Sequence, residues 1–231
     1  MKLDKYKDKT ILILGGGTST LDTKWENLNY DYVWTCNQFF LEPRVLNQNI
    51  DVYLLSHTVD ISNEVLIGKL KDSDTQVFIE GIHYRGKQHT PGFKKFCEKI
   101  NIPVSEMQFS TVTKSQSAAG FSGATFRMIL TALQTEAKKI YFTGFDGFNR
   151  DFSNIHAFTK HKGLKPTDTR RTYEGTRESY KTVFTEAYKW LGEQPGSDRL
   201  QNLGEGFDYN IGTPVSKEYF PLTKEVYDKI R

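Results

Sequence analysis

The sequence has few of the features that mark secreted, membrane-spanning or metal-binding proteins. Its 231 residues include only two cysteines, Cys36 and Cys97, and their spacing fits no zinc motif. No apolar run approaches the roughly 20 residues that span a bilayer. The charged N-terminus also lacks the apolar stretch of a signal peptide. We therefore expect a reduced, cytoplasmic protein (of a cell or of an infected host), with at most peripheral membrane contact.

Several signatures of catalysis are missing as well. No Gly-Lys-Ser/Thr follows a glycine-rich turn, so there is no Walker A loop, and no His-Glu-x-x-His motif occurs. The Asp-x-Asp at residues 72–74 lies in a hydrophilic stretch and is typical of a solvated turn. The net charge of +3 is too small to indicate a nucleic-acid-binding protein, yet it does not exclude one.

What the sequence does contain is an alternation of short apolar runs and amphipathic stretches. This alternation predicts βαβ units and a mainly parallel sheet, in a single Rossmann-like α/β domain over residues 1–231. Strands are expected at Ile11–Leu14, Tyr32–Thr35, Val52–Leu55, Val77–Glu80 and Ile140–Thr143, and further ones near Met107–Val112 and Phe207–Asn210. Helices are expected over Ala124–Lys138, Arg177–Leu191 and Phe93–Lys99.

Residues 149–176 differ from the rest of the chain because they are polar, basic and weakly periodic. A long segment of this kind inside a compact domain is usually a functional lid or a disordered loop. Lys160, Arg170 and Arg171 suit a phosphate group. His156 and His161 are candidates for a general acid or base, although two solvated loop histidines are the simpler interpretation.

Two short segments at expected strand ends carry residues that suit a nucleotide. The first is the turn made of Gly15, Gly16, Gly17, Thr18 and Ser19. Glycines let the backbone approach a phosphate, and the hydroxyls of Thr18 and Ser19 can donate to it. In the second segment, Asn37 and Gln38 follow Cys36 and suit a base edge or sugar hydroxyls, with an asparagine-led turn as an equal alternative.

A third segment includes the longest expected helix and the strand that follows it. Ser122 and Gly123 are expected at the helix start, where serine is a common N-cap and backbone amides can hold an anionic group. The strand ends in Gly144, Phe145 and Asp146, and that carboxylate can hold ribose hydroxyls or act as a base, with a tight turn as the alternative. Together the three segments predict a nucleotide site.

In this order and spacing, the three segments resemble the bacterial CMP-sialic-acid-dependent sialyltransferases that modify lipooligosaccharide. That family has a Gly-Asn-Gly-Pro-Ser loop, then Cys-Asn-Gln-Phe, then a Ser-Gly helix before Gly-Ile-Asp-Phe-Tyr. The match spans residues 10 to about 158. It implies a GT-A-like domain with a lid, and inverting, metal-independent transfer from a nucleotide sugar, which is a co-substrate, with no cofactor. It also implies that Asn37 and Ser122 contact the nucleotide, with Asp146 beside it.

The chain departs from the family pattern at the catalytic positions. Gly16 stands where the family has its loop asparagine, and the family's two tyrosines fall near Phe148 and His156. The family's histidine base has no counterpart in residues 172–177. We therefore expect His156 or His161 either to act as the base or to supply the proton that the tyrosines would give, or Arg170, Arg171 and the lid lysines to offset the charge of the leaving phosphate instead.

The sequence leaves the acceptor open between a glycan and a hydroxylated base in viral DNA. The basic stretch 160–177 suits either a nucleic-acid backbone or the donor's own phosphates. A pyrophosphokinase-like phosphotransferase and a non-catalytic nucleotide-binding module are the alternatives to a glycosyltransferase. The donor sugar and the oligomeric state stay undetermined.

Overall fold

The computed structural model describes residues 3–17, 19–55, 59, 63–80, 95, 98, 101, 104–107, 116–145 and 190–204. The expected strand near 207–210 and the expected lid at 149–176 lie outside these ranges. The same is true of most of the helices expected at 93–99 and 177–191, although residues 190–192 are helical. Within the described ranges, no helix has the length and apolar character needed to cross a membrane.

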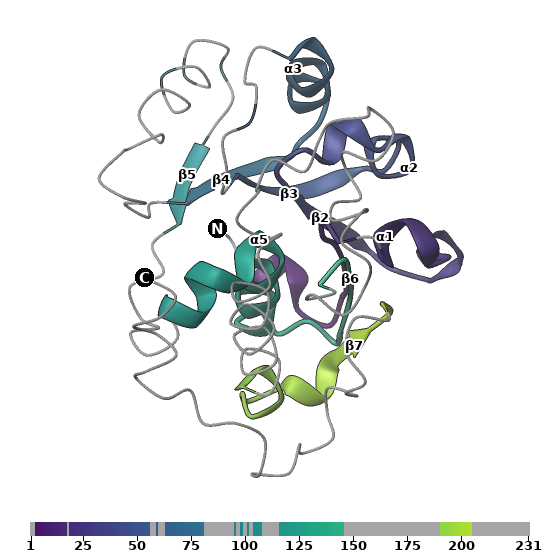
Figure 1. The fold of residues 1–231 in the computed structure, drawn as a ribbon, viewed down its shortest axis with the longest axis vertical. Coiled ribbons are helices and arrows are strands. Elements are labelled where there is room, and N and C mark those ends of the chain that lie inside the picture. The colour runs from purple at the N-terminus through teal and green to yellow at the C-terminus, as the bar shows by residue number, and fades with distance from the viewer. Residues whose placement is uncertain are drawn as a thin grey trace, which may run out of the picture.

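The centre of the fold is a sheet of seven strands in which every neighbouring pair is parallel, as Figure 1 shows. Its order across the sheet is β5-β4-β3-β2-β1-β6-β7. The strands are β1 (Thr10–Leu14), β2 (Tyr32–Cys36), β3 (Ile50–Leu55), β4 (Gln76–Glu80), β5 (Val104–Met107), β6 (Lys139–Thr143) and β7 (Leu200–Asn202). The predicted Rossmann-like α/β class with a parallel sheet is confirmed.

Five of the expected strands are present, with ends shifted by at most two residues. Their apolar runs are continuous because helices cover both faces of a parallel sheet, so every residue of Ile11–Leu14 is buried. The strand expected at Met107–Val112 is different: β5 runs over Val104–Met107 and shares only one residue with it. The short strand β7 was not predicted, because Leu200 is its only buried residue.

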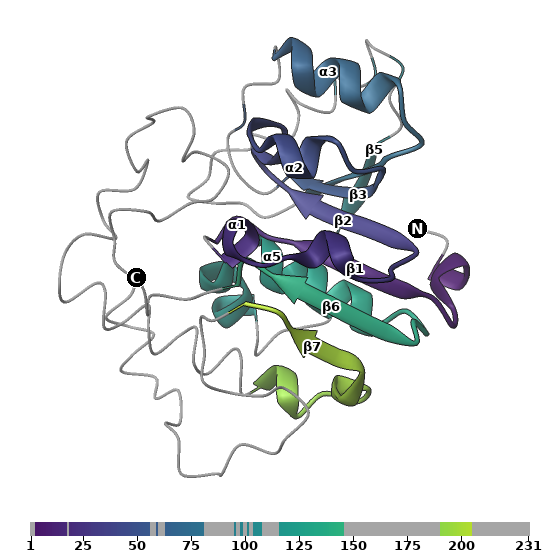
Figure 2. The same cartoon turned by 90° about the vertical axis from the view of Figure 1, so that its right-hand side faces the viewer.

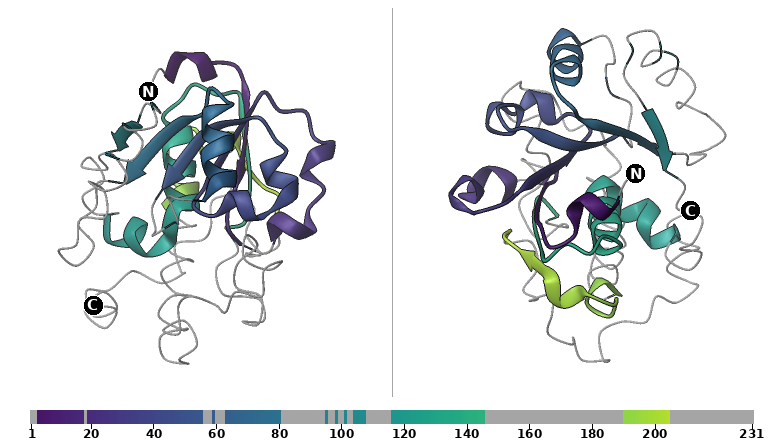
Figure 3. Two further views of the ribbon diagram at one scale, coloured as in Figure 1. Left: turned by 90° about the horizontal axis from the view of Figure 1, so that it is seen from above. Right: turned by 180° about the vertical axis from the view of Figure 1, so that it is seen from behind.

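Helices lie on both faces of the sheet. The helices α1 (Ser19–Asp22), α2 (Pro43–Leu46) and α3 (Glu64–Lys71) connect successive strands from β1 to β4, whereas α5 (Gln116–Leu133) packs against β1, β2, β3 and β6. Figure 1 shows α5 on the opposite side of the sheet from α1 and α2. Seen from behind in Figure 3, the N-terminal 3-10 helix η1 (Leu3–Tyr6, purple) lies on the same side as α5 (teal).

The core between the sheet and this face is rich in aromatic rings. Tyr6 is fully buried and packs edge-on against Tyr32 and Trp34, with ring centroids 5.1 Å apart in both pairs. Its hydroxyl donates to Asp51, whose other carboxylate oxygen lies 2.6 Å from the ammonium of Lys5. Burial and the adjacent carboxylate raise the pKa of Tyr6, so the phenol stays protonated and keeps this bond.

The prediction for the longest helix was wrong at both ends. We expected Ala124–Lys138, with Ser122 as N-cap, but α5 begins at Gln116 and ends at Leu133. Ala118 and Ala119 are strong helix formers, so the helix continues N-terminal to Ser122, which is its seventh residue. Beyond the C-terminal end, the amides of Gln134 and Thr135 bond three residues back, which tightens the chain into a turn.

The C-terminal end of α5 is capped by an arginine from a distant part of the chain. The guanidinium of Arg199, in the 3-10 helix Ser197–Arg199, donates to the carbonyls of Leu133, Thr135 and Ala137, at 2.8 Å each. A cation is favourable here because the last carbonyls of a helix are unpaired and carry partial negative charge. Arg199 therefore ties β7 to α5 and β6.

Candidate functional site

The strand order creates a switch point between β1 and β6. The chain moves outward from β1 to β5 on one side, then returns to place β6 on the other side of β1. Ligands of open α/β sheets bind at such a switch point, outside the carboxyl ends of the strands. In Figure 2, β1 ends at α1, beside the carboxyl end of β6. Two of the three predicted segments, 15–19 and 144–145, lie here.

Hydrogen bonds join these two segments directly. The amide of Gly17 donates to the carbonyl of Gly144 at 2.9 Å, and the amide of Gly144 donates to the Ser19 hydroxyl at 2.8 Å. The Ser19 hydroxyl also lies 2.9 Å from that of Thr143. The Thr20 hydroxyl donates to the carbonyl of Gly15 at 2.7 Å. Both turns are thus held by one set of contacts centred on the first residues of α1.

These bonds change the expected use of the glycine-rich turn. Ser19 is fully buried and its hydroxyl is engaged by β6, so it positions the turn instead of facing a ligand. The amides of Gly15 and Gly17 are also occupied, by the carbonyls of Thr143 and Gly144. Gly16 is half-buried, and its amide makes no hydrogen bond to the described part of the chain. Thr18 lies outside the described residues.

Glycine is required at the two points where the turns cross. A Cβ on Gly15 would stand 2.3 Å from the Thr125 hydroxyl oxygen and 2.8 Å from the Gly144 carbonyl oxygen. Gly144 has a φ of +72°, and a Cβ there would stand 2.5 Å from backbone atoms of Gly15. The glycines therefore serve a close approach of β1, β6 and α5, which is a structural role distinct from admitting a phosphate.

The second predicted segment adjoins this crossing. Thr35 donates to the carbonyl of Leu14 at 2.9 Å, which fixes the end of β2 beside the end of β1. Cys36 bonds to Thr125, the threonine that also packs on Gly15. Burial raises the pKa of the Cys36 thiol to about 12, so it is a neutral core residue and not a nucleophile.

Asn37 forms a turn immediately beyond β2. Its φ of +49° is left-handed, a conformation in which asparagine is favoured among residues with a side chain. Its amide donates to the carbonyl of Leu54, and its carbonyl accepts from the Tyr53 hydroxyl at 2.9 Å. The asparagine-led turn is thus present, and a contact between Asn37 or Gln38 and a nucleotide stays a prediction.

The helix and strand of the third segment contribute to the core. Ser122 and Gly123 lie inside α5, so the predicted helix start at Ser122 is wrong, and a contact between these residues and a nucleotide stays a prediction. Phe145 is buried and stacks on Phe126 with ring centroids 5.8 Å apart. The same helix buries Arg127, and desolvation lowers the pKa of its guanidinium to about 9.

The predicted catalytic residues and phosphate ligands cannot be placed. His156, His161, Asp146, Lys160, Arg170 and Arg171 lie outside the described residues. No cluster of metal-ligating side chains occurs in the ranges that the structure describes, and the expectation of a metal-independent site stays a prediction. The Asp-x-Asp at 72–74 is confirmed as a turn after α3, with both carboxylate residues exposed.

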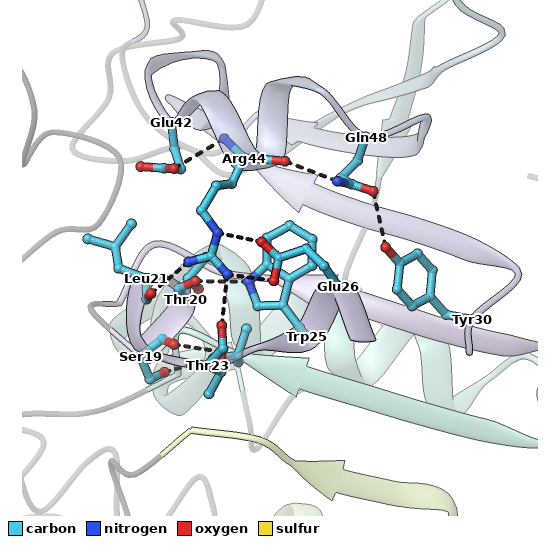
Figure 4. Close-up of polar contacts among 11 residues, drawn as sticks. Ser19, Thr20, Leu21, Thr23, Trp25, Glu26, Tyr30, Glu42, Arg44 and Gln48 are labelled. Atoms are coloured by element: carbon cyan, nitrogen blue, oxygen red, sulfur yellow. Dashed lines mark hydrogen bonds and ion pairs between the residues drawn. The ribbon is translucent and has the colours of Figure 1, made fainter. Parts of the chain in front are cut away.

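Sequence analysis missed a group of contacts around Arg44, on the other side of the glycine-rich turn, which Figure 4 shows. The guanidinium of Arg44 donates to the carbonyls of Leu21 and Thr23, at 2.6 and 2.8 Å, and to the carboxylate of Glu26. It also lies over the ring of Trp25, 5.0 Å from the centroid. Pro43 at the first position of α2 is a helix-start signal that the sequence predictions did not use, and nothing in the sequence indicates which segment Arg44 contacts.

No protein-family model matches the chain, and no curated protein matches it with significance. The class that the structure defines is a Rossmann-like α/β protein with a closely packed glycine crossing at its switch point.

Proposed function

We propose that this protein is a glycosyltransferase that binds a nucleotide sugar at the carboxyl ends of β1, β2 and β6. One observation supports the proposal above others: residues 15–17 and 144–145, which are far apart in sequence, meet at the switch point of a parallel sheet, and residues 37–38 follow the neighbouring strand β2, whose end is bonded to the end of β1. This is the position at which open α/β sheets bind nucleotides. These are also the segments that resemble the sialyltransferases.

The contacts within the turns suggest how the donor lies. Because Gly15 and Gly144 are in van der Waals contact, no ligand enters between them. The donor then lies outside the crossing, where the amide of Gly16 is available to a phosphate oxygen. Gln38 is half-buried beyond β2, and its side chain makes no hydrogen bond within the described ranges, so its amide group is available to the base or ribose.

The proposed reaction is an inverting displacement without a metal ion. An acceptor hydroxyl, of a glycan or of a hydroxylated DNA base, attacks the anomeric carbon while His156 or His161 accepts its proton. The bond from the anomeric carbon to the phosphate oxygen breaks, and the nucleotide leaves with both electrons. Lys160, Arg170 and Arg171 offset the negative charge of this phosphate, and Asp146 lies beside the nucleotide.

A thermal-shift panel tests the nucleotide site. The full-length chain is heated with CMP, UDP, GDP and ADP and their sugars, each with and without Mg²⁺. A ligand at 100 times its dissociation constant adds about 2.7 kcal/mol, which raises the Tm of a chain of this size by about 5 to 10 °C. Stabilisation by one nucleotide without metal supports the proposal. Stabilisation only by ATP with Mg²⁺ overturns it in favour of phosphotransfer.

Two further experiments locate the donor and the base. Gln38→Ala should lower the affinity for the nucleotide about tenfold. Gln201→Ala, which changes an exposed residue of the edge strand β7, should leave that affinity unchanged. With the donor identified, His156→Ala and His161→Ala are compared, and the true base should lose roughly a hundredfold or more in kcat with donor binding little changed. A protein that binds a nucleotide sugar but turns over no acceptor would be a binding module.

A further inference from the structure

Arg44 acts on the candidate site through the short helix α1. That helix has four residues, Ser19–Asp22, and a helix of this length is unstable unless other groups bond its ends. Carbonyls at its C-terminal end receive hydrogen bonds from two side chains. Arg44 donates to those of Leu21 and, just beyond the helix, Thr23, and the Trp25 indole donates to that of Thr20 at 2.9 Å.

The arginine is itself held on three sides. Its own amide donates to the Glu42 carboxylate, which caps the first turn of α2. Its guanidinium forms a two-pronged contact with Glu26 and stacks on the fully buried Trp25. A planar fork of this kind has no equivalent in lysine, which offers a single ammonium group. The pair with Glu26 keeps the pKa of Arg44 above its usual value.

The opposite end of α1 fixes both glycine turns. The Thr23 hydroxyl donates to the carbonyl of Ser19 at 2.7 Å, and the Ser19 hydroxyl accepts from the amide of Gly144. The Thr20 hydroxyl bonds the carbonyl of Gly15. Continuous contacts thus lead from Arg44 through α1 to the two backbone segments that meet at the switch point, as Figure 4 shows for the part from Glu42 to Ser19.

We infer that Arg44 is a positioning residue for ligand binding: it holds α1 so that Ser19 and Thr20 keep the Gly15–Gly17 turn in its binding conformation. The ligand part of this inference rests on the proposed function. The conformational part does not, because it concerns only the bonds of Gly17 and Gly144.

Amide hydrogen exchange measured by NMR on the full-length protein separates positioning from general stabilisation. In Arg44→Gln, the amides of Gly17 and Gly144 should exchange roughly tenfold faster or more, because Gly144 donates to Ser19 in α1 and Gly17 donates to Gly144. Amides in β3 and β4 should exchange as in the wild type. In Arg44→Lys, which keeps the charge but not the planar fork, the exchange rates of these two glycine amides should lie between those of the wild type and those of Arg44→Gln. This variant also keeps the test usable if the glutamine variant does not fold.

Arg199→Gln is the matched control, since it also removes an arginine whose guanidinium donates to backbone carbonyls at the C-terminal end of a helix. It should lower the free energy of unfolding without selectively changing exchange at Gly17 and Gly144. If Arg44→Gln leaves these two amides protected, or raises exchange equally throughout the sheet, the inference is overturned.

Nucleotide affinity gives the second readout. The dissociation constants of CMP, UDP, GDP and ADP are measured by calorimetry, and the one that binds the wild type should bind Arg44→Gln about tenfold more weakly and Arg199→Gln equally well. Equal affinity in Arg44→Gln would refute the role in binding. If none of the four binds the wild type, the proposed function fails, while the exchange result still decides whether Arg44 positions the turn.

Discussion

Replacing Gly144 with alanine should damage the protein at the point where β1 and β6 cross. A left-handed backbone costs an alanine about 1–2 kcal/mol. The added methyl group would also stand 2.5 Å from the carbonyl carbon and oxygen of Gly15 and from the Thr20 hydroxyl. Two of these atoms are backbone and cannot rotate away, so the turns must separate, which costs about a further 1–3 kcal/mol. We expect a total destabilisation of about 2–5 kcal/mol.

The chain offers a control of opposite sign. Gly68 lies inside α3, and a Cβ there would meet nothing within 4 Å. Gly68→Ala should therefore stabilise the protein by about 0.5–1 kcal/mol, because glycine is a poor helix former. Urea unfolding followed by circular dichroism gives both values. A thermal scan should show Gly144→Ala melting about 10 °C lower and Gly68→Ala slightly higher than the wild type. Equal stabilities of Gly144→Ala and the wild type would refute the close crossing.

Three other outcomes follow from the contacts described. Arg199→Ala should lower the free energy of unfolding in urea by about 2 kcal/mol with an unchanged m-value, because three carbonyls at and just beyond the C-terminal end of α5 lose a charged donor. In a Cys97→Ser background, Cys36 should resist iodoacetamide at pH 8 in the folded protein and react on unfolding, since burial raises its pKa to about 12; rapid labelling would contradict that burial. The contact with Arg44 lowers the pKa of Glu26. Their pair therefore stabilises the fold at pH values above the usual glutamate pKa of about 4.3. This stabilisation is lost as the pH falls through the lowered pKa of Glu26. Glu26→Gln should therefore lower the free energy of unfolding by under about 1 kcal/mol at pH 7, because the pair is partly exposed. The loss should be smaller below pH 4, and a loss that grows toward low pH would contradict this conclusion.

Patterns within one element predicted much of the fold. The apolar runs at 11–14 and 140–143 indicated strands of a parallel sheet with both faces covered, and all four residues of 11–14 and three of 140–143 are buried. The start of α5 was missed because Ser122 followed by Gly123 is a typical helix start, and the helix-forming residues before it were given too little weight. The three residues of β7 have no period of their own, and their place in the sheet depends on β6.

The candidate site was predictable in position but not in detail. The strand-end rule indicated residues 15–19, 37–38 and 144–145. The bonds of Ser19 and Gly17 to Gly144 were not predictable, because they depend on how closely the turns after β1 and β6 approach each other in the fold. Arg44 was missed for the same reason: its partners lie about 20 residues earlier, and only the packing of α1 against α2 brings them together.

The strand order also determines when the site can form during synthesis. β1 pairs with β2 within the first 36 residues, but its other neighbour, β6, is not made until residues 139–143. Until then one edge of β1 is unpaired, and Ser19 has no Gly144 to bond. A ribosome-bound chain that ends before residue 144 can assemble β1 to β5, yet it cannot close the crossing on which nucleotide binding is proposed to depend. Such long-range pairing slows folding, and the open edge invites association with other chains. The crossing can then close only after β6 and Gly144 have been synthesised.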